Sequence, residues 1–185
     1  MITTNELKNG MTILVDSVVH QIIEFQHIKP GKGHAFVRTK LRNLRTGAVI
    51  DHNFRAKEPV EQAIVDRRPL EYLYRDRAAY HFMDPATYDQ ITVAGLLVEP
   101  VSKFLKENEQ VNVTIYDGEV IEVSLPAIVE LKVTDAPPGV KGDTASGGTK
   151  PVTLETGAVI QAPLFIEAGQ AVKVDTRTGE YLTRA

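Results

Sequence analysis

Apolar and polar residues alternate along several short segments of the chain, a period-two pattern typical of β-strands with one buried face. The clearest case is 34–44, which follows a β-branched and aromatic run over 18–29. Within it, Ala35, Val37, Thr39 and Leu41 alternate with Phe36, Arg38, Lys40 and Arg42. These two segments predict a pair of strands around the sequence Lys29-Pro30-Gly31-Lys32-Gly33.

The strand pattern restarts twice, after Pro59 and again from Ala127. No long amphipathic helical pattern interrupts it; 100–107 is expected to form a single short helix, and Asp84-Pro85 to begin a brief helical turn. We therefore predict an all-β protein with three small barrels in series: an SH3-like (KOW-like) domain over 1–63 and OB-fold barrels over 64–127 and 128–185. Further strands are expected over 49–54, 69–74, 79–83, 111–116, 120–125, 129–133, 158–160, 163–166, 171–174 and 180–183.

The first turn has an unusual composition. Pro30 fixes one backbone angle, and Gly31 and Gly33 permit positive φ on either side of Lys32. The pattern predicts a lysine at an exposed hairpin tip, followed directly by His34. An ordinary β-turn whose lysine keeps the loop soluble would have the same pattern, so the tip alone does not establish a function.

Charge is distributed unevenly along the chain. The net charge is −3, but residues 1–62 carry nine Lys or Arg against six Asp or Glu, whereas 63–126 carry six against eleven. Residues 29–45 hold six basic residues and no acid. This local basic patch could follow a phosphate backbone, and we expect RNA contacts from Arg38, Lys40 and Arg42.

A second candidate for RNA contact is the long Gly- and Pro-rich loop over 137–151, because long loops in compact domains are often functional. Its glycines can bring backbone amides close to phosphates or bases, and Lys150 adds charge at one end. A flexible connection with no other role is the alternative.

Several function classes have no support in the sequence. Cysteine is absent, which excludes disulfides and thiolate chemistry, and the five histidines lack metal-binding spacing. The glycines near Lys32 do not complete a phosphate-binding GxxxxGK[ST] motif, and no GxSxG elbow is present. We expect no enzyme activity, no metal and no cofactor. The N-terminus lacks a signal-peptide pattern and no membrane span is expected, so a cytoplasmic location is predicted.

Four motifs together are similar to those of a known family. They are Lys29-Pro30-Gly31-Lys32-Gly33, Tyr72-Leu73-Tyr74, Gly142-Asp143-Thr144 and Thr178-Gly179-Glu180-Tyr181, with a specific run over 150–163. The chain resembles bacterial translation elongation factor P over essentially its whole length. The resemblance implies an L-shaped, tRNA-like arrangement of the three barrels, and binding to the 70S ribosome between the P and E sites. It also implies relief of stalling at consecutive prolines.

The resemblance further assigns roles to particular residues. Lys32 would be the functional tip beside the CCA end of the P-site peptidyl-tRNA, and the residue that a lysine-modifying enzyme extends covalently. The residues that would support the tip are Lys29, Pro30, Gly31, Gly33 and His34. Gly142, Asp143 and Thr144 would approach mRNA in the E site. Two alternatives stay open: an elongation factor P-like paralogue, and a general single-stranded RNA-binding OB-fold protein.

Overall fold

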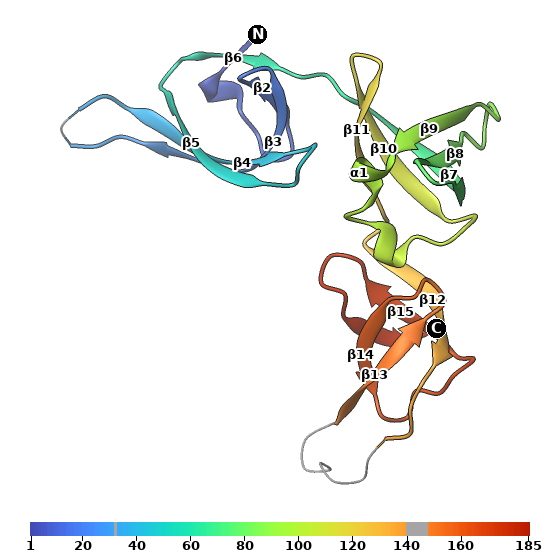
Figure 1. Cartoon of the computed structure of the whole chain (residues 1–185). Helices are drawn as coiled ribbons and strands as arrows, with labels where there is room; N and C mark the ends of the chain where they lie inside the picture. The colour runs from blue at the N-terminus through green and yellow to red at the C-terminus, as the bar shows by residue number, and fades with distance from the viewer. Residues whose placement is uncertain (32, 140–147) are drawn as a thin grey trace. The chain divides into compact units, whose positions relative to one another are not determined.

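The structure, a computed structural model, describes residues 1–31, 33–139 and 148–185 and contains three β-sheets in succession along the chain (Figure 1). The first sheet has the order β1-β6-β2-β3-β4-β5. Its strands are β1 (Ile2–Thr3), β2 (Thr12–Val15), β3 (Val18–Ile28), β4 (Phe36–Asn43), β5 (Val49–Arg55) and β6 (Pro59–Gln62). The all-β prediction is confirmed, while closure of each sheet into a barrel stays a prediction.

Strand β4 confirms the alternation read from the sequence. Val37, Thr39 and Leu41 are fully buried, and the side chains between them lie on the other face. The inward face joins Ile13, Ile22 and Phe54 in one apolar core. Strand β4 pairs antiparallel with β3 up to the pair Ile28 and Phe36. The tip residues therefore lie beyond the end of a long hairpin ladder.

The second sheet has the order β11-β10-β7-β8-β9, with a short helix α1 (Gly95–Val98) between β9 and β10. Its strands are β7 (Asp66–Arg75), β8 (Ala79–Met83), β9 (Gln90–Ala94), β10 (Gln110–Tyr116) and β11 (Glu119–Ser124). Tyr72, Tyr80 and Phe82 are buried, and the centroid of the Tyr72 ring lies 5.8 Å from that of Tyr80 and 5.5 Å from that of Phe82.

The predicted single helix over 100–107 is wrong. The structure has α1 before this segment and only one 3₁₀ turn within it, Ser102–Phe104. Pro100 has no N–H and cannot continue the α-helical hydrogen bonds of α1. The next bonds have three-residue spacing, from Val101 N to Val98 O at 3.0 Å and from Phe104 N to Val101 O at 3.2 Å, as in 3₁₀ turns. Leu105 then returns to extended backbone with ψ of 119°.

The third sheet has the order β14-β13-β12-β15-β16. Its strands are β12 (Ile128–Asp135), β13 (Thr149–Leu154), β14 (Val159–Pro163), β15 (Ala171–Asp175) and β16 (Tyr181–Arg184). The predicted strand over 163–166 is wrong, because the chain turns after Pro163, whose carbonyl accepts a hydrogen bond from Ile166 N at 3.0 Å. The first half of β13 lies inside the segment predicted to be loop.

Contacts between residues divide the chain into two compact units. The first contains 1–67 together with 114–122, and the second contains 68–113 together with 123–185. The tip of the β10–β11 hairpin therefore belongs to the first unit, where Ile121 completes a small apolar cluster with Val19, Leu44 and Ala63. The three-domain boundaries 1–63, 64–127 and 128–185 stay a prediction.

Phe104 is a central packing residue of the second unit. Its side chain is 8% exposed and lies in the apolar core formed by the third sheet, among residues such as Leu131 and Ile160. Gly179, with φ of +74°, lies against the ring: a Cβ at this position would be 3.5 Å from Phe104 Cζ. The 3₁₀ turn between β9 and β10 of the second sheet is thereby fixed to the third sheet.

Candidate functional site

The tip of the β3–β4 hairpin is the first candidate. Lys29, Pro30, Gly31, Gly33 and His34 are all exposed, and Gly33 has φ of +111°. Positive φ at a glycine of this turn is what the sequence predicts, because residues with a Cβ rarely adopt it. Lys32 itself lies outside the described residues. The hairpin therefore presents an exposed tip in which two of the described residues are glycines and carry no side chain.

The outward face of β4 carries the basic residues of the predicted patch. Arg38 is exposed and pairs across the sheet with two neutral residues, Gln26 and Asn53. Lys40 lies between two acids, with Glu24 Oε2 3.7 Å from its Nζ and Asp51 as its partner on β5. Acidic residues on neighbouring strands therefore lower the net positive charge of a patch whose own sequence contains no acid.

Arg42 already has partners within the first unit. Its Nη2 donates to Glu122 Oε1 at 2.8 Å and to Gln21 Oε1 at 3.3 Å, and Glu122 Oε2 also accepts from the Thr114 hydroxyl at 3.3 Å. The Glu122 side chain is only 12% exposed. Arg42 thus holds the β10–β11 tip in this unit, and its RNA contact stays a prediction.

We expect the Arg42–Glu122 pair to contribute measurably to stability. A double-mutant cycle with Arg42→Gln and Glu122→Gln should give a coupling free energy of about 1–3 kcal/mol in urea unfolding, because the carboxylate is largely removed from water. The matched control is the exposed pair Arg45–Glu119 at 3.5 Å, which should give about 0–0.5 kcal/mol. Equal coupling in the two pairs would contradict the expectation.

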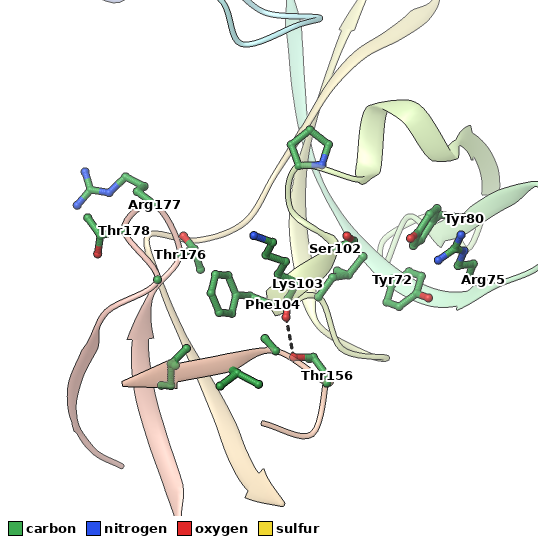
Figure 2. A pocket seen from close by; sticks show the side chains of 17 residues that line it. Tyr72, Arg75, Tyr80, Ser102, Lys103, Phe104, Thr156, Thr176, Arg177 and Thr178 are labelled. Carbon is green, nitrogen blue, oxygen red and sulfur yellow. Dashed lines mark hydrogen bonds between the residues drawn. The ribbon is translucent and has the colours of Figure 1, made fainter. Parts of the chain in front are cut away.

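A second candidate is a pocket of about 820 Å³ inside the second unit (Figure 2). Its lining combines Arg75, Lys103 and Arg177 with threonine hydroxyls and the rings of Tyr72 and Tyr80, and contains no carboxylate. The Thr156 hydroxyl donates to the Lys103 carbonyl at 2.6 Å. No local sequence pattern predicts this pocket, because its lining residues come from widely separated segments.

Two of the cationic side chains of this pocket already interact with other side chains. Arg75 lies over the Tyr80 ring with its guanidinium carbon 5.0 Å from the centroid. Arg177 Nη2 donates to Asp175 Oδ2 at 3.0 Å. This side-chain hydrogen bond, together with those from the backbone N–H groups of Arg177 and Thr178, lowers the pKa of Asp175 to about 2. The cationic and hydroxyl side chains of the lining are suited to binding a polar or anionic group.

The third-domain candidates are only partly described. Lys150 lies on β13, where it is 7% exposed. Gly142, Asp143 and Thr144 lie outside the described residues. The RNA contacts proposed for these four residues stay predictions. Within 1–31, 33–139 and 148–185, no group of three or more His, Cys, Asp or Glu side chains could hold a metal ion, and no helix is long and apolar enough to cross a membrane.

Three family models match successive parts of the chain. Residues 3–60 match the elongation factor P KOW-like domain, 65–123 the elongation factor P OB domain, and 129–184 the elongation factor P C-terminal domain. A solved translation initiation factor eif-5a family protein from Naegleria fowleri has the same fold over part of the chain. It has a TM-score of 0.50 and 17% identity, and the match covers 67% of this chain and 96% of that one.

Curated relatives match over the full chain. Elongation factor P of Moorella thermoacetica is 56% identical over 185 residues, with 100% of both chains covered. Elongation factor P of Corynebacterium urealyticum is 54% identical, with 100% of this chain and 98% of the relative covered. The three successive domain matches and this full-length identity agree with one another. This chain therefore belongs to the elongation factor P family of translation factors.

Proposed function

We propose that this factor binds the 70S ribosome between the P and E sites and stimulates peptide-bond formation at consecutive prolines. In this proposal Lys32 holds the CCA end of the P-site peptidyl-tRNA. The observation that carries it is the hairpin tip: exposed residues on both sides of Lys32 extend beyond the last pair of the β3–β4 ladder, and Gly33 adopts positive φ.

The physical basis of the proposed activity is positioning. Proline is a constrained secondary amine, so a reaction between two prolyl residues is sensitive to small misplacement of the reacting groups, and about 1 Å can cost on the order of 100-fold in rate. A cation on a long flexible stem can hold the tRNA end without reacting. The ribosome performs the chemistry, and this chain acts without a cofactor.

The same proposal assigns the remaining surfaces. Arg38 and Lys40 contact the tRNA backbone, and Gly142, Asp143 and Thr144 approach mRNA in the E site. The factor acts in the cytoplasm. A lysine-modifying enzyme extends Lys32, which adds hydrogen-bond donors farther from the backbone. The family membership and the exposed tip support these assignments.

The test is translation in a reconstituted bacterial system that lacks this factor. Adding the native chain should increase full-length product from a message with a proline run, and leave unchanged a matched message in which the run is interrupted. No gain on the proline run would overturn the proposal. Rescue confined to other stall sequences would favour the paralogue, and RNA binding without any rescue would favour the general RNA-binding alternative.

A further inference from the structure

Two aromatic rings lie stacked on the outer face of the second sheet. The ring centroids of Tyr74 and His81 are 4.4 Å apart with an interplanar angle of 19°. Tyr74 is nevertheless 47% exposed. One face of the tyrosine ring is therefore supported by the histidine while much of the side chain remains open to solvent.

A β-bulge places Tyr74 on this face. The pairing of β7 with β8 shifts register between Tyr72 and Tyr74, so that Tyr72 pairs with Phe82 in the core whereas Tyr74 pairs with His81. Without the extra residue, Leu73, both tyrosines would point to the same side. The sheet thus departs from regular pairing at the point where the tyrosine ring turns outward.

Hydrogen bonds fix the histidine ring that supports Tyr74. With its proton on Nε2, His81 donates to Asp76 Oδ2 at 2.8 Å, and its Nδ1 accepts from the Thr92 hydroxyl at 3.3 Å. Asp76 Oδ1 in turn accepts from the backbone N–H groups of Ala78 and Ala79, both at 2.8 Å. The histidine ring against which Tyr74 stacks is therefore held in place before any ligand binds, which reduces the ordering cost of binding.

The surroundings suit an unpaired base. In OB-folds, the face of the second and third strands and the loop between the first two strands bind oligonucleotides. Here those strands are β8 and β9, whose outward residues are free of Asp, Glu, Lys and Arg: Ala79, His81, Met83, Gln90, Thr92 and Ala94. Arg77 lies exposed in the loop between β7 and β8 and supplies a cation for a phosphate.

We propose that Tyr74, backed by His81, is a stacking site for one unpaired RNA base, with Arg77 beside the adjoining phosphate. Stacking on an aromatic ring is tolerant of base identity, which suits a factor that meets many tRNAs. The proposal goes beyond the tip and rests on the proposed function only for the source of the RNA, a tRNA or a ribosomal RNA.

The test uses the full chain, carbon-13 labelled at tyrosine and histidine rings, titrated with a single-stranded RNA hexamer and, separately, with a blunt RNA duplex. The hexamer should shift the Tyr74 and His81 ring resonances, and the duplex should not. Tyr74→Ala should weaken hexamer binding at least about fivefold, while Tyr74→Phe keeps it. The matched control is Tyr88→Ala, since Tyr88 is 72% exposed in the same sheet region and should not matter.

Unmoved ring resonances, equal shifts with the duplex, or unchanged affinity in Tyr74→Ala would each overturn the stacking site. Chemical probing of RNA bases in ribosome complexes then identifies the source of the stacked base. A base that the native protein protects and Tyr74→Ala does not is that base, and its position shows whether it belongs to the tRNA or to the ribosomal RNA. Hexamer binding needs no ribosome. The stacking site can therefore be confirmed even if proline-run rescue is not observed, and rescue can be observed even if the hexamer does not bind at Tyr74.

Discussion

Replacing Lys32 by alanine is expected to abolish the gain in proline-run synthesis. The change removes the cation that is proposed to hold the tRNA end, and with it the amine available for covalent extension. Because misplacement of reacting groups by about 1 Å costs on the order of 100-fold, the rate of Pro–Pro bond formation should fall at least tenfold, to the level without factor. Single-turnover kinetics of dipeptide formation on programmed ribosomes measures this rate.

Two further variants of the tip distinguish the effect of a lysine at position 32 from the effect of positive charge in the turn. Lys29→Ala removes an exposed cation from the same turn and should retain most of the stimulation. Lys32→Arg keeps a cation but offers no lysine amine to a modifying enzyme, so it should match unmodified native protein. Full activity of Lys32→Ala would contradict the assignment, as would an equal loss in Lys29→Ala.

Replacing Phe104 by alanine should cost the second unit about 3–5 kcal/mol of unfolding free energy, because truncating a buried phenylalanine removes apolar burial and leaves a cavity. The ring lies in the core of the third sheet but comes from the 3₁₀ turn between β9 and β10 of the second sheet. Loss of this contact should therefore also weaken the attachment of that turn. Chemical denaturation followed by amide hydrogen exchange measures both effects.

Phe165→Ala is the matched control within the same unit. Phe165 is 63% exposed, so its truncation should change the unfolding free energy by less than about 0.5 kcal/mol. Similar losses of unfolding free energy in the two variants would mean that the burial of Phe104 does not determine the effect of its truncation. An unchanged exchange rate in the 102–105 segment of Phe104→Ala would contradict the attachment role.

Local patterns predicted much of the fold correctly. The alternation over 34–44 gave the buried face of β4, and the Pro and Gly composition of 29–33 gave an exposed turn with positive φ at Gly33. Both features depend on neighbours in sequence. Strand β13 escaped prediction because Pro151 within it usually argues against a strand. Here Pro151 pairs with Gln161 of β14, while the β12 pairing of β13 is confined to its last two residues.

Features set by distant residues could not be read from the sequence. Arg42 is bound by Glu122, 80 residues away, and Lys40 meets acids on two other strands. Lys150 was expected to add charge at one end of a long loop but is buried on β13. Tyr74 reaches the outer face only through a bulge, which period-two alternation does not anticipate. In each case tertiary packing decides what a side chain can contact.

The sharing of the β10–β11 hairpin between the two units has a consequence for biosynthesis. The first unit includes 114–122, so a nascent chain that has released only residues 1–67 lacks Ile121 and keeps Val19 and Leu44 uncovered. The unit is completed only when the hairpin tip leaves the exit tunnel. Expression of 1–67 alone would leave the same apolar surface open, which favours association between copies.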